Sequence, residues 1–227
     1  MKWLLEFYRS SLGKKAVMAV TGVLLFGFVL FHMLGNLKLF LGPEKINGYA
    51  EGLRLLGEPI LNHGDLLWIL RVGLLAAVVL HVLSAWQLRR LNARARPKGY
   101  VKQSPQAATY ASRSMFWGGL LIVLFVVYHL LHLTVGFDAV HAEFIPGEVH
   151  HNMVTAFANP LVAGFYVLAV LALGFHLYHG LWSFFQSLGW TGPRLDVFRH
   201  RFAILFAVVV TVGFITVPIA ILIRLVS

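Results

Sequence analysis

The chain has 227 residues, of which 59% are hydrophobic and only 12% are charged, whereas about 25% of residues carry a charge in an average soluble domain. This composition leaves room for several membrane spans and little else. The formal net charge of +10 is therefore attributed to membrane topology and to a docking face, not to nucleic acid. The absence of cysteine excludes disulfides and metal ligation by thiolates.

Five apolar stretches follow one another along the chain, and each covers the ~20 residues that an α-helix needs to cross a bilayer. They lie at about 15–41, 66–88, 115–137, 160–188 and 202–225. The first stretch is too long for the apolar region of a cleaved signal peptide. The sequence therefore predicts an all-α membrane protein, with one domain over 1–227 that is a bundle of five transmembrane helices.

The charged residues divide unevenly between the predicted loops. Most Lys and Arg precede the first span or lie in the second and fourth loops, whereas most acids lie in the first and third loops. The positive-inside rule then places the N-terminus in the cytoplasm and the C-terminus outside. The segment 93–106 is rich in Pro, Lys and Arg and is predicted to be an extended cytoplasmic loop.

Four of the predicted spans carry a histidine deep in the apolar sequence, at His32, His81, His129 and His176. With a rise of 1.5 Å per residue, the first and third lie ~25 and ~24 Å from the cytoplasmic end, and the second and fourth lie ~12 and ~18 Å from it. Ionisable groups at such depths usually mark a function. Two imidazoles from facing helices are the ligands that a haem iron needs when it carries electrons. The pattern predicts two stacked bis-histidine sites, as in a di-haem cytochrome b.

Two further histidines compete with this assignment. His132 follows His129 by three residues, and His179 follows His176 by the same step, so each shares a helix face with its neighbour. Depth alone slightly favours His179 over His176. The remaining histidines are expected in loops or at interfaces without a direct role: His63, His141, His150, His151 and His200.

A motif on the fourth span resembles a known family. Phe175-His176 followed by Gly180-Leu181-Trp182-Ser183-Phe184 is similar to the H-x-x-x-G-[LV]-W motif of the cytochrome b membrane-anchor subunit of succinate dehydrogenase/fumarate reductase, in its single-subunit, five-helix, di-haem class. The resemblance extends over nearly the whole chain. It includes His32 with Asn36, His81 at the second-helix position, and the stretch that ends at His129.

The resemblance implies an assignment of the ligands. The first residue of the motif is the family's ligand, which favours His176 over His179. His32 with His129 would hold a distal haem, and His81 with His176 a proximal one. His132 and His179 would then contact the ligands or the haem propionates.

The same resemblance implies the cofactors and partners. These are two haem b groups and a membrane quinone, for which menaquinone is the first expectation although the sequence leaves the quinone type open. A flavoprotein subunit with FAD and an iron–sulfur subunit would dock on the cytoplasmic face of an inner-membrane, multi-pass protein, and the complex could form a higher oligomer. Basic residues around 89–113, with Arg194 and Arg199, are expected to meet the iron–sulfur subunit and to balance haem propionates. The chain itself has no site for succinate oxidation.

A quinone site is predicted near the outer end of the second span. Arg71 lies ~15 Å outward of His81, and Trp68 lies one turn further out on the same face. Glu58 and Asp65 precede this helix and could exchange protons with the outer aqueous phase. A competing pocket could lie on the cytoplasmic side, near Trp86 and Arg113. The simpler interpretation is an interfacial anchor for Trp68 and a propionate contact for Arg71.

Two other functions remain open on the sequence. One is the di-haem anchor of another quinone-linked dehydrogenase or hydrogenase, which the H-x-x-x-G-L-W segment disfavours. The other is a haem-free transporter whose intramembrane histidines relay protons, although the inverted repeat typical of that class is missing.

Overall fold

The computed structural model describes residues 2–95, 110–187, 189–190 and 192–226, and every regular element in that part of the chain is helical. The long helices are α2 (Ser11–Asn36), α4 (Asp65–Ala95), α5 (Tyr110–Leu130), α7 (Pro160–Ser187) and α8 (Pro193–Leu222). The short ones are α1 (Lys2–Arg9), α3 (Pro43–Arg54) and α6 (Val149–Ala158), with a 3-10 turn at Leu37–Leu41 after α2 and a π-helical turn at Leu131–Val135 after α5. The prediction of an all-α protein is confirmed.

Five helical segments are long and apolar enough to cross a membrane. They are Ser11–Leu41, Asp65–Ala95, Met115–Val135, Pro160–Gln186 and Pro193–Leu222, so the five predicted spans are confirmed. The fifth begins earlier than the predicted residue 202, because Pro193 is preorganised for a first turn and Asp196 complements the helix dipole there. Likewise α4 continues to Ala95 through good helix formers, so the predicted loop at 93–106 begins inside this helix and otherwise lies outside the described residues.

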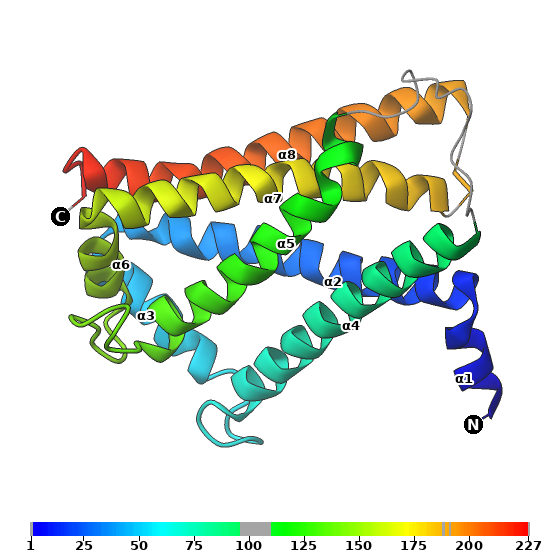
Figure 1. The fold of residues 1–227 in the computed structure, drawn as a ribbon. Helices are drawn as coiled ribbons and strands as arrows, with labels where there is room; N and C mark the ends of the chain where they lie inside the picture. Colours follow the sequence, from blue (N-terminus) through cyan, green and yellow to red (C-terminus); the bar gives the residue numbers. More distant parts are fainter. Residues whose placement is uncertain (1, 96–109, 188, 191, 227) are drawn as a thin grey trace.

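The long helices pack as neighbouring pairs along the bundle (Figure 1). The helices α7 and α8 run antiparallel, side by side, while α2 packs against α4 and α5 crosses α7. One end of the bundle holds α3, α6 and the C-terminus, and the other holds α1 and the connection from α7 to α8. We call the former the outer end and the latter the inner end, names that follow the predicted orientation.

Small residues allow the backbones of three helices to come close together. A Cβ atom added at Gly174 on α7 would overlap the Thr211 side chain of α8, and one at Gly213 on α8 would overlap the Met33 side chain of α2. Within a membrane, helices associate through such close van der Waals packing. These glycines therefore place α8 against both α7 and α2.

Buried apolar side chains concentrate at the outer end. There a cluster that includes Leu39, Ile46, Phe157, Tyr166 and Ile221 joins the short helices α3 and α6 to α7 and α8. Along the most apolar stretch of each span, only 6% of the residues are buried in α4 and in Met115–Val135, against 28% in α7 and 33% in α8. The α4 and α5 faces are thus left for lipid, cofactor or partner subunits.

Candidate functional site

The four deep histidines form two facing pairs in the interior of the bundle. The ring of His32 on α2 faces that of His129 on α5, with the ring centroids 5.8 Å apart. The ring of His81 on α4 faces that of His176 on α7 at 6.2 Å. Each ligand candidate comes from a different helix, and the pairs are the two that depth along the sequence predicted.

The two pairs lie at different levels along the bundle. Counting residues on α2 and on α7 gives the same separation between the two levels. Gly22 lies beside the His81 ring, so ten residues of α2 separate that level from His32, which is ~15 Å along the axis. Tyr166 contacts His129 and lies ten residues before His176 on α7, again ~15 Å. The pairs are therefore stacked along the bundle, with His32 and His129 nearer the outer end.

The spacing within each pair suits one metal ion between two imidazoles. With metal–nitrogen bonds of ~2 Å, the ring centroids would lie about 6 Å apart. No group of three or more His, Cys, Asp or Glu side chains that could hold a metal occurs in the part of the chain that the structure describes. A metal with two protein ligands needs another group to fill its remaining positions, as the haem macrocycle does. The residues present thus fit a bis-histidine haem.

A threonine sets the tautomer of His81 in the inner pair. Thr21 Oγ1 lies 3.2 Å from His81 Nδ1, and the same hydroxyl donates to the Val17 carbonyl oxygen at 2.7 Å. A hydroxyl has a single proton to donate, so Thr21 accepts from Nδ1 of the imidazole. The His81 proton then resides on Nδ1, which leaves the Nε2 lone pair free to bind a metal.

In the outer pair, a tyrosine hydroxyl contacts the Nδ1 atom of His129. The Tyr166 hydroxyl lies 3.3 Å from His129 Nδ1 and 2.9 Å from His132 Nδ1. Since it can donate to only one of these rings, it accepts from the other. If the hydroxyl accepts from His129 Nδ1 and donates to His132 Nδ1, the Nε2 atom of His129 is left free. Neither Tyr166 nor Thr21 was singled out from the sequence, because a hydroxyl in an apolar helix gives no local sign of what it touches.

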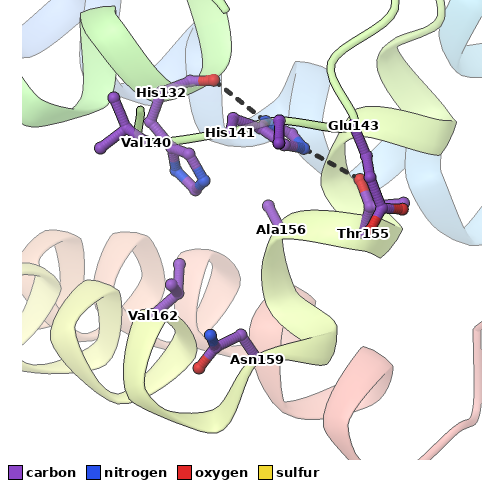
Figure 2. Close-up of a pocket in the computed structure, with 9 residues that line it drawn as sticks. His132, Val140, His141, Glu143, Thr155, Ala156, Asn159 and Val162 are labelled. Atoms are coloured by element: carbon purple, nitrogen blue, oxygen red, sulfur yellow. Dashed lines mark hydrogen bonds between the residues drawn. The ribbon is translucent and has the colours of Figure 1, made fainter. Parts of the chain in front are cut away.

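His132 belongs to a polar cluster at the outer end (Figure 2). Its side chain is buried, and its carbonyl oxygen accepts a hydrogen bond from His141 Nδ1 at 3.1 Å. His141 Nε2 lies 3.0 Å from Thr155 Oγ1, and that hydroxyl also donates to the His151 carbonyl oxygen at 2.9 Å. These side chains, with Glu143 and Asn159, line a cavity of about 140 Å³. His141 lies in the loop after α5, where it was expected, and it is buried there and ties that loop to α6.

Glycines leave space beside the histidine pairs. A Cβ atom at Gly22 would lie 3.5 Å from His81 Cε1, and one at Gly119 would lie 3.9 Å from His176 Cε1. Residues without side chains let a flat cofactor approach a helix backbone, so this pattern is a second observation that fits haem.

The predicted quinone residues are only partly brought together. The Arg71 guanidinium lies over the Trp68 ring, with Cζ 5.0 Å from the ring centroid, which agrees with their expected common face. Trp68 is exposed, as is Glu58 in the turn before α4. At the competing inner site, Arg90 lies over the exposed Trp86 ring at 4.5 Å, while the Arg113 side chain lies outside the described part.

Fold and site together define a membrane-spanning helical bundle with two internal histidine pairs. Residues 92–216 match the family of the succinate dehydrogenase/fumarate reductase transmembrane subunit. This match covers more than half of the 227 residues, and the chain belongs to that family. His129 and His176 lie within the matched residues, and His32 and His81 precede them. Searches of curated proteins and of solved structures found no match.

The family membership confirms the resemblance to the transmembrane subunit of succinate dehydrogenase/fumarate reductase. The chain is a multi-pass membrane anchor subunit of a succinate dehydrogenase/fumarate reductase complex, which implies catalytic partner subunits.

Proposed function

We propose that this subunit is a di-haem cytochrome b that carries electrons between a cytoplasmic iron–sulfur subunit and a membrane quinone. The observation that carries the proposal is the two facing pairs, His32 with His129 and His81 with His176, at 5.8 and 6.2 Å between ring centroids. Their separation of ~15 Å along the helices is short enough for electrons to pass between two cofactors. The succinate-oxidising site lies in a partner subunit with FAD.

The residues of this chain would bind and orient the cofactors. The four histidines would hold the two haem groups through their Nε2 atoms, and bound haem would supply a one-electron carrier. Thr21 holds the His81 ring through Nδ1, and Tyr166 holds the His129 ring. Such outer hydrogen bonds fix the tautomer and direction of a ligand. The apolar helices exclude water from both pairs.

The decisive experiment measures the haem content and the absorption spectrum of the purified protein. We expect two low-spin haem b groups per chain. His81→Ala or His176→Ala should remove one haem, and His32→Ala or His129→Ala the other, whereas His200→Ala on the exposed face of α8 should retain both. An intact spectrum in His176→Ala with a loss in His179→Ala would contradict the ligand assignment. A chain that binds no haem would favour the transporter alternative.

The partner surface is proposed to lie at the inner end. Arg94, near the end of α4, is exposed, and Arg96 and Lys98 lie outside the described residues. If these charges recruit the iron–sulfur subunit, replacing all three by Gln should reduce the yield of the assembled complex at physiological salt. Undiminished assembly would leave them as topology signals in an inner membrane with the N-terminus in the cytoplasm.

Quinone is proposed to bind at the outer end, near Arg71 and Trp68. The contact between these two side chains supports the proposal, because it holds a polar group next to an aromatic ring at the membrane interface. Quinone-linked turnover should fall in Arg71→Leu and Glu58→Gln while both haems are retained. Normal turnover in both variants would redirect the search to the inner side, near Trp86. Neither result depends on whether the quinone is menaquinone.

A further inference from the structure

The short helix α1 lies at the level where the first span meets the inner membrane surface. It ends at Arg9, and the candidate span begins at Ser11. Figure 1 shows that α1 runs across the direction of α2 at the inner end of the bundle, instead of extending that helix. Because α2 crosses the membrane, a helix that turns aside at this level lies along the membrane surface. Its two sides then meet different surroundings, acyl chains on one side and headgroups on the other.

A corner of hydrogen bonds and close packing holds α1 in this direction. Ser10 Oγ donates to the Phe7 carbonyl oxygen at 2.6 Å and accepts from the Gly13 amide at 2.9 Å. A Cβ atom at Gly13 would overlap the Phe7 carbonyl oxygen, so glycine is needed for α1 to lie against the start of α2. The direction of α1 is therefore fixed by the residues on both sides of Ser10.

The ammonium group of Lys14 completes this corner. Its Nζ atom donates to the carbonyl oxygens of Tyr8 and Arg9 at 2.9 and 2.8 Å, and it lies 5.1 Å from the centre of the Tyr8 ring. The side chain is only 7% exposed, and a buried charge is costly without such partners. A positive charge at the C-terminal end of a helix also complements its dipole. Lys14 thus stabilises the fold, and the basic residues of 1–15 that remain for a ligand are Lys2, Arg9 and Lys15.

The sequence of α1 divides into an apolar side and a polar side. Trp3 and Phe7 are four residues apart and share one side of the helix. Lys2, Glu6 and Arg9 follow one another at steps of four and three residues on another side. Phe7 is 45% exposed, and Arg9 is exposed as well. Since a helix of eight residues is marginal in water, α1 needs surroundings that cover its apolar side and accept its positive charge.

We propose that α1 is an interfacial helix that binds the anionic headgroups of phospholipids in the inner leaflet. Arg9 and the exposed Lys15 at the start of α2 meet the lipid phosphates, with Lys2 on the same side of α1 as Arg9. The charge favours this ligand, because 1–15 contains four basic residues and one acid. Basic amphipathic helices bind anionic membranes, and tryptophan is enriched at their interface. Lipid binding at α1 needs neither haem nor quinone, so it stands apart from the proposed function.

The test measures hydrogen exchange of the α1 amides in the full chain, reconstituted in lipid nanodiscs. One set of discs contains phosphatidylcholine alone, and the other contains phosphatidylcholine with phosphatidylglycerol. A basic residue near an anionic membrane strengthens binding about fivefold. Net of Glu6, the three remaining basic residues leave two positive charges, so the anionic discs should slow exchange in α1 by about tenfold to thirtyfold. Salt at about 1 M should remove most of this difference.

Substitutions separate the charged contact from the apolar one. Arg9→Gln and Lys15→Gln should each reduce the effect of phosphatidylglycerol about fivefold. Arg194→Gln is the matched control, because it removes an exposed arginine of α8 near the same end of the bundle and should leave exchange in α1 unchanged. Phe7→Ser should speed exchange in both kinds of disc and keep the ratio between them, because an apolar side chain does not distinguish the two headgroups.

Three results would overturn the proposal. The first is equal exchange of the α1 amides in the two kinds of disc at low salt. The second is the same response to phosphatidylglycerol in Arg9→Gln, Lys15→Gln and Arg194→Gln. The third is protection of α1 that is independent of phosphatidylglycerol and follows only from adding the soluble partner subunits, which would assign this helix to a protein interface. Because the readout is exchange in α1, a chain that binds no haem would still give a clear answer.

Discussion

Tyr166→Phe should destabilise the outer end of the bundle while preserving its shape. The substitution removes the hydroxyl but keeps the ring, which packs edge-on against Phe125 at 4.9 Å and Phe157 at 4.8 Å. The Tyr166 hydroxyl lies 2.9 Å from His132 Nδ1 and 3.3 Å from His129 Nδ1.

The magnitude follows from these two contacts. Hydrogen bonds between membrane helices contribute about 0.6 kcal/mol on average and ~1.7 kcal/mol at most, and leaving a buried group unpaired costs ~1–3 kcal/mol. His132 is 1% exposed, so its ring has little contact with bulk water. We therefore expect the free energy of unfolding to fall by about 1–2 kcal/mol, mostly through the shorter bond.

The assay is reversible unfolding in mixed micelles as the fraction of SDS rises, followed by circular dichroism. Tyr128→Phe is the matched control, because its ring belongs to the same aromatic cluster while its hydroxyl makes no hydrogen bond to the described residues. That change should stay within ~0.5 kcal/mol. Adding His132→Leu to Tyr166→Phe should cost less than the sum of the single changes, because both partners are then gone.

Equal losses of stability for Tyr166→Phe and Tyr128→Phe would refute this reasoning. So would strict additivity with His132→Leu, because the hydroxyl would then stabilise through something other than the imidazole.

Two further predictions concern packing and pH. Gly174→Leu should destabilise the α7–α8 contact by ~1–3 kcal/mol or more, because its Cβ would overlap Thr211. Gly164→Leu is the control, because a Cβ at that position of the same helix lies in open space. Similar unfolding curves for both variants would refute the packing argument. The hydrogen bond from His63 Nε2 at 2.8 Å, followed by that from Arg54, lowers the pKa of Glu51 below its usual value. A lowered pKa in the folded state contributes stability that is present above the unfolded value of ~4.3 and is lost as pH falls through the folded value. As the pH falls below about 4, the amides of α3 should therefore lose protection from hydrogen exchange in the unsubstituted protein but not in Glu51→Gln. Identical pH profiles for the two proteins would contradict the ion pair.

The sequence by itself determined the spans and the levels of the histidines. Hydropathy is a local property, and a run of ~20 apolar residues has one stable outcome in a bilayer. Position along a helix then converts directly to depth. His32 and His129 could therefore be matched, as could His81 and His176, before any packing was known. The early start of α8 at Pro193 was not predicted, because its first turns are polar and extend beyond the apolar run.

Tertiary structure alone decided which side chains meet across helices. Tyr166 on α7 reaches two histidines of the α5 segment, and Thr21 on α2 reaches His81 on α4, contacts that depend on the rotation of each helix about its axis. His141 looked like a loop residue, yet the fold of its loop buries it against Thr155. Spacing along one helix gives depth and face, whereas the partner on another helix depends on how the two helices pack.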